Sequence, residues 1–120
     1  MTTEKKQKTD REKVQKSSVN CTDKLCPFHR KNAVKLRGRT FEGRVVAKLH
    51  GRVAIEFERI LEIRKYERYE KRKTKLHARL PDCLSDKIQV GDLIKIAECR
   101  PLSKIIHFIV VEKIKDKAEK

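Results

Sequence analysis

Residues 40–49, "TFEGRVVAKL", decide the fold, because apolar and polar side chains alternate along them. One face carries Phe41, Gly43, Val45, Ala47 and Leu49, and the residues between them face the other way. A period of two predicts a half-buried β-strand. A glycine in the middle of such a strand predicts a bend, so we expect this strand to curve at Gly43.

Four further strands are predicted after this one. The other elements follow in chain order: a tight turn at 50–52, a strand at 53–63, a basic connector, a short strand at 72–80, a loop at 81–86, and strands at 93–97 and 105–111. The last two strands are separated by a polar insert, residues 98–104, which is longer than a hairpin requires. A long, bent first strand can pair on both sides and remove the exposed edge of a sheet. The sequence therefore predicts an all-β, five-stranded barrel.

Length and composition predict one small domain with polar ends. A chain of 120 residues is long enough for a single core. The first twenty residues combine surplus charge with almost no apolar side chains, so they cannot build a core of their own. The predicted organisation is a disordered basic extension at 1–20, an N-terminal extended segment at 21–33, the barrel at 34–114 and a flexible tail at 115–120.

The net charge of +15 at pH 7 predicts a partner with dense negative charge. A membrane fits less well than nucleic acid, because no apolar run approaches the ~20 residues of a spanning helix. No N-terminal stretch has the apolar centre of a signal peptide. We therefore expect a soluble, cytoplasmic protein with no membrane partner and no small-molecule substrate.

Basic side chains concentrate at residues 60–80, which hold eight Lys or Arg and three Glu. Such a run can be an ordinary solvated face. Lys71, Lys73 and Lys75, however, occupy alternate positions of one predicted strand. Like charges on one face repel unless an anion lies across them, so this region is predicted to contact RNA.

The aromatic residues favour folded RNA over single strands. The chain has no Trp, and Phe41, Phe57 and Phe108 are predicted to face inward. Few rings are then left for stacking on unpaired bases. Double-helical RNA is read through its shape, phosphates and 2′-hydroxyls, whereas nothing in the sequence predicts a recognition helix for the major groove of DNA.

The cysteines give weak support to a metal site. Cys21, Cys26 and His29 lie close together in "CTDKLCPFH", but Cys83 and Cys99 are isolated in the sequence. Structural zinc sites commonly supply two well-spaced ligand pairs. We therefore expect free thiols, no cofactor and zinc that is absent or dispensable, with Cys21, Cys26 and His29 as the weak metal candidates.

Catalysis is not expected. A metal-dependent nuclease needs clustered carboxylates, but Asp82, Asp86 and Asp92 are separated by turn and strand residues. The four histidines are scattered without a paired nucleophile or acid. The open alternative to a structural RNA-binding protein is a free-standing translation factor or RNA chaperone with the same barrel, for which we would expect more surface aromatics.

The segment "GDLIKIAECRPLSK", residues 91–104, resembles the signature of the small-subunit ribosomal protein family number seventeen. The stretches "GRVVAKLHGR", "KYERYEKRKTKLH" and "CPFH" are similar to its archaeal and eukaryotic branch, and the short chain favours an archaeal member. The resemblance implies an oligonucleotide-binding (OB-fold) barrel. It also implies a structural constituent of the small ribosomal subunit that binds the 5′ domain of small-subunit rRNA, supports assembly and contacts neighbouring ribosomal proteins.

Charge and resemblance together assign RNA contacts to three regions. The predicted residues are Arg44, Lys48, His50 and Arg52 in the first hairpin, then Arg64, Lys65, Tyr66, Arg68, Tyr69, Lys71, Arg72, Lys73, Lys75 and His77 in the connector, and Arg100, Pro101, Leu102, Ser103 and Lys104 in the polar insert. Pro101 has a fixed φ, so the insert is predicted to be a stiff tip that projects from the barrel into RNA.

Overall fold

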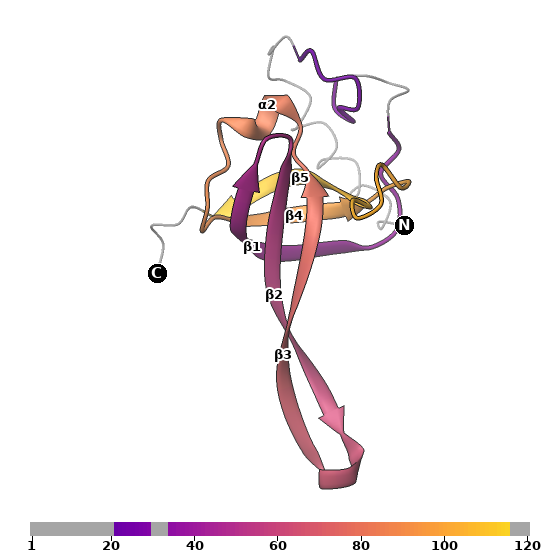
Figure 1. The fold of residues 1–120 in the computed structure, drawn as a ribbon, viewed down its shortest axis with the longest axis vertical. Helices are drawn as coiled ribbons and strands as arrows, with labels where there is room; N and C mark the ends of the chain where they lie inside the picture. The colour runs from indigo at the N-terminus through magenta and orange to yellow at the C-terminus, as the bar shows by residue number, and fades with distance from the viewer. Residues whose placement is uncertain (1–20, 30–33, 116–120) are drawn as a thin grey trace, which may run out of the picture.

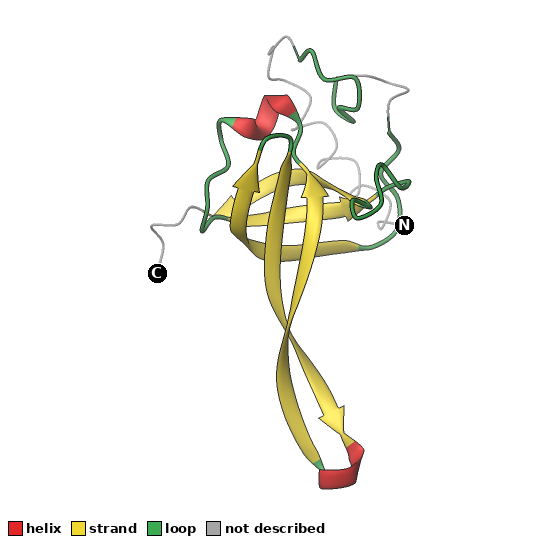
Figure 2. Cartoon of the chain, in the orientation of Figure 1, coloured by secondary structure: helices red, strands yellow, loops and turns green. Residues whose placement is uncertain are grey.

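The computed structural model describes residues 21–29 and 34–115 (Figures 1 and 2). Its strands are β1 (Thr40–Leu49), β2 (Arg52–Ile63), β3 (Arg68–Arg79), β4 (Leu93–Glu98) and β5 (Phe108–Lys115). A 3-10 turn, η1 (Arg64–Tyr66), joins β2 to β3, and a short helix, α2 (Asp82–Ser85), follows β3. The predicted extension at 1–20 and the end of the predicted tail, residues 116–120, lie outside the described residues. Within the described ranges, no helix has the length and apolar character needed to cross a membrane.

β1 closes the barrel by pairing with two strands. Residues 40–44 pair with β4, and residues 44–49 pair with β2. The strand order β1-β2-β3-β5-β4 returns to β1, and the short contact between β3 and β5 is parallel. This is the arrangement of an OB-fold, so the predicted all-β, five-stranded barrel is confirmed.

Gly43 lies close to the point where β1 changes its pairing partner. This glycine is buried and pairs with Ile94 of β4. A Cβ atom built on it would lie 3.0 Å from the carbonyl oxygen of Glu56 and 3.0 Å from Cδ1 of Ile55. Glycine therefore lets the backbone of β2 approach β1 closely where β1 changes partners.

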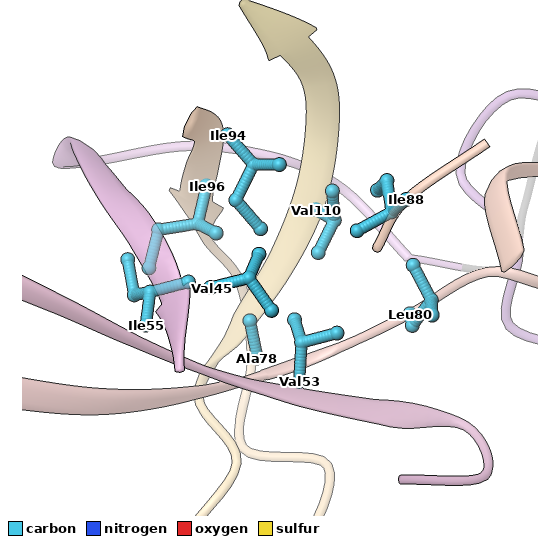
Figure 3. Packing of buried hydrophobic residues seen from close by; sticks show 9 residues of the cluster. All are labelled: Val45, Val53, Ile55, Ala78, Leu80, Ile88, Ile94, Ile96 and Val110. Carbon is cyan, nitrogen blue, oxygen red and sulfur yellow. The ribbon is translucent and has the colours of Figure 1, made fainter. Parts of the chain in front are cut away.

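The core consists of nine buried side chains contributed by all five strands and by the segments on either side of α2 (Figure 3). They are Val45, Val53, Ile55, Ala78, Leu80, Ile88, Ile94, Ile96 and Val110. Because Leu80 and Ile88 flank α2, this helix covers one end of the barrel (Figure 1).

Three phenylalanine rings pack against this core near the point where β2 and β3 leave the barrel. Phe41 stacks on Phe57 with ring centroids 5.3 Å apart and meets Phe108 edge-on at 5.7 Å. The rings face the core as predicted, but each is only partly buried. Leu49, predicted on the same face as Phe41, is instead 54% exposed, because the register shifts between Val45 and Ala47 and the strand runs past the core.

The predicted basic connector is wrong. β2 and β3 form one continuous antiparallel hairpin, paired from Arg52 with Arg79 to Ile63 with Arg68. The third strand therefore begins at Arg68, four residues before the predicted segment at 72–80. The outer part of this hairpin has no buried face, so the apolar alternation that marks a half-buried strand is weak there.

Two boundaries near the end of the barrel also differ from the prediction. The predicted loop at 81–86 contains the four-residue helix α2. The fifth strand begins at Phe108 rather than at residue 105, because residues 99–107 form a loop. That loop is closed at its base by a hydrogen bond of 3.0 Å from the N–H of Cys99 to the carbonyl of His107.

A buried ion pair holds the loop before β4 against β5. Asp92 is 2% exposed, accepts the N–H of Gln89 at 2.8 Å and lies 2.9 Å from Nζ of Lys113. The same ammonium donates to the carbonyl of Lys87 at 3.0 Å. The carboxylate and the lysine thus join the loop that follows α2 to the last strand.

We predict that Gly43→Val lowers the free energy of unfolding by about 1–3 kcal/mol, because the new side chain has to displace the backbone of Glu56 and the side chain of Ile55. Thr40→Val puts the same side chain at an exposed position of β1 and should change that free energy by less than about 0.5 kcal/mol. Urea denaturation of both variants measures the difference. If both variants were equally stable, the backbone of β2 could move away from β1 without loss of stability, and the role assigned to Gly43 would be wrong.

We predict that Asp92→Asn lowers the free energy of unfolding by about 2–3 kcal/mol, because Lys113 then keeps its partly buried charge without a carboxylate. The control is Glu112→Gln, which breaks a more exposed pair with Lys95 at 3.5 Å and should cost less than about 1 kcal/mol. Thermal unfolding followed by circular dichroism ranks the two. A greater loss for Glu112→Gln would contradict the role assigned to Asp92.

Candidate nucleic-acid interface

The outer part of the long hairpin, residues 57–77, forms an arm that leaves the barrel. Pairing of β1 with β2 reaches only to Glu56, and pairing of β5 with β3 involves only Ala78 and Arg79. The arm strands thus pair with each other alone among the described strands. Figure 1 shows the arm extending away from α2 and ending at η1. It carries eight Lys or Arg and four Glu.

Like charges face each other across the arm. Arg59 of β2 lies directly opposite Arg72 of β3, and both side chains are exposed. Nε of Arg72 also lies 3.2 Å from a carboxylate oxygen of Glu70. Like charges opposite one another destabilise an antiparallel strand pair, so an anion beside these guanidinium groups would stabilise the arm.

The three strand lysines have different neighbours on the opposite strand, which the sequence did not predict. Lys71, Lys73 and Lys75 are all exposed, but Nζ of Lys73 lies 3.8 Å from Glu56, which is also opposite Lys75 in the strand register. Lys71 lies opposite Ile60 instead. The repulsion inferred from sequence is therefore partly relieved by a carboxylate on the neighbouring strand.

The end of the arm also presents aromatic rings. Tyr66 is 65% exposed and Tyr69 is 76% exposed. Nζ of Lys65 lies 5.4 Å from the centroid of the Tyr66 ring, which is within the range of a cation–π contact. The arm thus combines positive charge with two rings on which bases can stack.

The first hairpin lies beside α2, at the other end of the molecule from η1 (Figure 1). His50 is exposed in its turn and Arg52 is half-buried. Lys48 uses its ammonium within the protein, because Nζ donates to the carbonyl oxygens of Ser85 and Ile88, the latter at 2.9 Å. Lys48 therefore ties β1 to the α2 segment.

The predicted tip is a closed loop with an apolar anchor. The N–H of Leu102 donates to the carbonyl of Ile106 at 3.0 Å, and the Leu102 side chain packs against a second apolar cluster around Ile109. Arg100 and Lys104 remain exposed. The loop thus presents two basic side chains from a backbone that is held in place.

The predicted RNA-binding residues therefore fall into separate regions. Lys48, His50 and Arg52 lie near α2, Arg44 is exposed on β1, the residues Arg64, Lys65, Tyr66, Arg68, Tyr69, Lys71, Arg72, Lys73, Lys75 and His77 lie on the arm, and Arg100, Pro101, Leu102, Ser103 and Lys104 lie in the loop of residues 99–107.

Sequence reasoning missed two arginines. Arg39 and Arg59 line a hollow of about 600 Å³ whose apolar wall includes Phe41, Phe57 and Phe108. The alternation of residues 53–63 puts Arg59 on the same face as Phe57 and so gave no sign that it is exposed. No periodic signal marks Arg39, because it precedes the first strand.

Three thiols and one imidazole meet beside α2. The Sγ atoms of Cys21, Cys26 and Cys83 and a ring nitrogen of His29 all lie within 4.8 Å of one another. Sγ of Cys26 lies 3.3 Å from Nδ1 of His29 and 3.7 Å from Sγ of Cys83. The prediction that Cys83 is isolated is wrong, because the fold brings it to Cys26 across 57 positions of sequence.

Burial and mutual proximity keep two of these thiols protonated in the absence of a cation. Burial raises the pKa of Cys26 above its ordinary value of 9.0. Burial also raises the pKa of Cys83, and its hydrogen bond to Cys26 and the charge of Cys26 raise it further. Together they bring the pKa of Cys83 to about 12. Both groups would need a nearby positive charge to ionise at neutral pH.

Asp23 anchors the segment that carries Cys21 and Cys26. Its carboxylate accepts the N–H of Leu25 at 3.0 Å and pairs with Arg79 of β3 at 2.8 Å. Burial by itself raises the pKa of Asp23, but these contacts outweigh burial and hold the pKa below its ordinary value of 3.8. The segment is thus attached to the barrel through an ionised aspartate.

Comparisons of the sequence with a family model and with individual known proteins point to the same family. A family model described as "Ribosomal protein S17" matches residues 43–112. The small ribosomal subunit protein uS17 of Methanoregula boonei is 48% identical over 100 residues, which cover 82% of this chain and 89% of that protein. The protein of the same name from Methanocaldococcus jannaschii is 47% identical over 102 residues, 84% of each chain. That of Methanocorpusculum labreanum is 45% identical over 98 residues, 81% of this chain and 87% of the relative.

We predict that Lys48→Met lowers the free energy of unfolding by about 1 kcal/mol, because the carbonyl groups of Ser85 and Ile88 lose a charged donor while the alkyl chain is retained. Lys71→Met, the same change at an exposed arm position, should leave stability within about 0.5 kcal/mol. Chemical denaturation compares the two. A stability loss confined to Lys71→Met would contradict the assignment of Lys48 to the α2 segment.

Proposed function

Because the chain belongs to the ribosomal protein S17 family, in its archaeal type, we propose that it is a structural constituent of the small ribosomal subunit. The family is a structural, non-enzymatic one. We further propose that the protein binds the 5′ domain of small-subunit rRNA directly, in the cytoplasm, and supports subunit assembly beside neighbouring ribosomal proteins. Archaeal relatives that carry the subunit in their names support the first proposal.

The arm is the observation that carries RNA binding. It extends beyond the barrel core, so its exposed side chains do not serve to fill that core. Arg59 and Arg72 face each other across the two strands. Glu70 beside Arg72 offsets part of this repulsion, and a further anion would stabilise the strand pair more. A narrow, basic ribbon with two tyrosines near its end fits a groove lined with phosphates and has rings for any base that is unpaired.

The loop of residues 99–107 supplies a second contact region. Arg100 can donate two parallel hydrogen bonds to phosphate oxygens, and Lys104 adds a second positive charge. The anchoring of Leu102 on the apolar cluster around Ile109 fixes the backbone before binding. A preformed loop has less conformational entropy to lose on binding, so this region fits recognition of RNA shape.

A free-standing RNA chaperone is less well supported. Such factors stack unpaired bases on aromatic side chains spread over the barrel. Three of the chain's six aromatic rings, those of Phe41, Phe57 and Phe108, pack against the core. Co-sedimentation with small subunits at moderate salt separates the two functions, because a free factor would be washed off.

We predict that Lys71→Ala weakens binding to a transcript of the 5′ domain and flattens the plot of log affinity against log salt by about one unit or slightly less. The reason is the loss of one phosphate contact. Lys87→Ala removes the same charge from the loop after α2, away from the arm, and should leave the slope nearly unchanged. Binding is measured by filter retention of the full-length protein over a series of salt concentrations.

Two results would contradict the proposal. If Lys71→Ala and Lys87→Ala change the slope equally, the arm is not a specific contact region and only net charge matters. If the parent binds an unrelated RNA duplex as tightly as the 5′ domain, the proposed rRNA target is wrong, whatever the arm does.

A further inference from the structure

We propose that Cys21, Cys26, His29 and Cys83 bind one structural zinc ion. The four donor atoms come from two parts of the chain, the segment before the barrel and the helix α2. They form a compact group, all within 4.8 Å of one another. This replaces the expectation from sequence that zinc is absent or dispensable, which depended on Cys83 being isolated.

The distances fit a tetrahedral ion. Zinc bonds of about 2.3 Å to sulfur and about 2.0 Å to nitrogen place neighbouring ligand atoms about 3.5–3.8 Å apart. The Sγ atoms of Cys26 and Cys83 are 3.7 Å apart, and Sγ of Cys26 lies 3.3 Å from Nδ1 of His29. Small side-chain adjustments would therefore suffice to place one ion among the four atoms.

The donor set also fits zinc. Three thiolates and one imidazole form a common structural site in which all four positions are filled by protein. Soft thiolate ligands select against magnesium and calcium, which prefer oxygen. The compactness of the group leaves room for a single ion, whereas the ligands of an iron–sulfur cluster bind different irons and lie further apart.

A disulfide explains less of the geometry. A bond between Cys26 and Cys83 would require their sulfur atoms, now 3.7 Å apart, to approach to about 2.05 Å. A disulfide would also not explain why Cys21 and His29 lie close to the same two sulfur atoms.

The surrounding backbone supports a charged sulfur. The N–H groups of Phe28 and His29 form hydrogen bonds with the thiol sulfur of Cys26, and such bonds disperse the charge of a metal thiolate. Asp23 lies between the first two cysteines in the sequence and pairs with Arg79 of β3, which holds the segment in position. The imidazole of His29 is exposed, whereas Cys26 is fully buried, so the ion would sit at the edge of the barrel.

Zinc would join residues 21–29 to α2. The segment contains no strand and contributes only Leu25 to the apolar clusters, so metal bonds would supply most of its attachment, together with the ion pair between Asp23 and Arg79. The barrel core contains none of the four ligands. Loss of zinc should therefore release the segment and leave the barrel folded.

The test uses the full-length chain without a histidine tag, dialysed and analysed for metal by mass spectrometry. We expect one zinc per chain, and we expect cobalt(II) added to the metal-free protein to give the visible spectrum of a tetrahedral thiolate site. Cys83→Ser and His29→Phe should each weaken zinc binding by on the order of 100-fold or more. The matched control is Cys99→Ser, because Cys99 is buried in the other apolar cluster and should bind zinc like the parent.

Amide exchange provides a second readout that does not depend on metal analysis. Chelation of zinc should remove protection from residues 22–29 and leave the amides of β1, β2 and β4 protected. The proposal is overturned by a Cys26–Cys83 disulfide in the purified protein, by a parent chain that retains no zinc after dialysis, or by Cys83→Ser binding zinc as tightly as Cys99→Ser. Loss of the whole barrel on chelation would overturn the attachment role.

Discussion

The double pairing of β1 is the constraint on which the rest of the structure depends. One strand hydrogen-bonds to β4 over its first half and to β2 over its second, and the glycine at residue 43 lets the backbone of β2 come close where the partner changes. Closure then fixes both ends of the barrel. α2 covers one end, while β2 and β3 leave as an arm from the other (Figure 1).

This geometry separates two kinds of chemistry. Many of the exposed cations lie on the arm, and two more lie on the loop of residues 99–107, where charge and shape can meet an anionic surface. The thiols and the imidazole lie beside α2, where the fold, rather than the local sequence, brings them together. The contacts of Lys48, Asp23 and Asp92 hold the α2 end in place, so the interface region and the proposed metal site need not interfere.

The sequence was sufficient for the barrel because its strands have one buried face. Alternation along residues 40–49 and 53–57 marks that face directly. The arm was missed because most of its side chains beyond Phe57 and Leu76 are exposed. Its pairing with the partner strand, rather than its own pattern, shows that β3 begins at Arg68. The contact of Cys83 with Cys26 was missed for a related reason. The two residues lie 57 positions apart, and the spacing of nearby residues cannot predict a contact that forms only when the barrel closes. The carboxylate of Glu56 beside Lys73 was hidden in the same way.

The arm leaves two rows of backbone N–H and C=O groups without a neighbouring strand among the described residues. Such rows are templates on which a second copy of a protein can add a strand and begin to aggregate. The closely spaced Lys and Arg of β3 oppose this at the β3 edge, because two such edges brought together would place like charges against each other. The charges that we propose for RNA contact therefore also oppose strand pairing between two copies at the β3 edge.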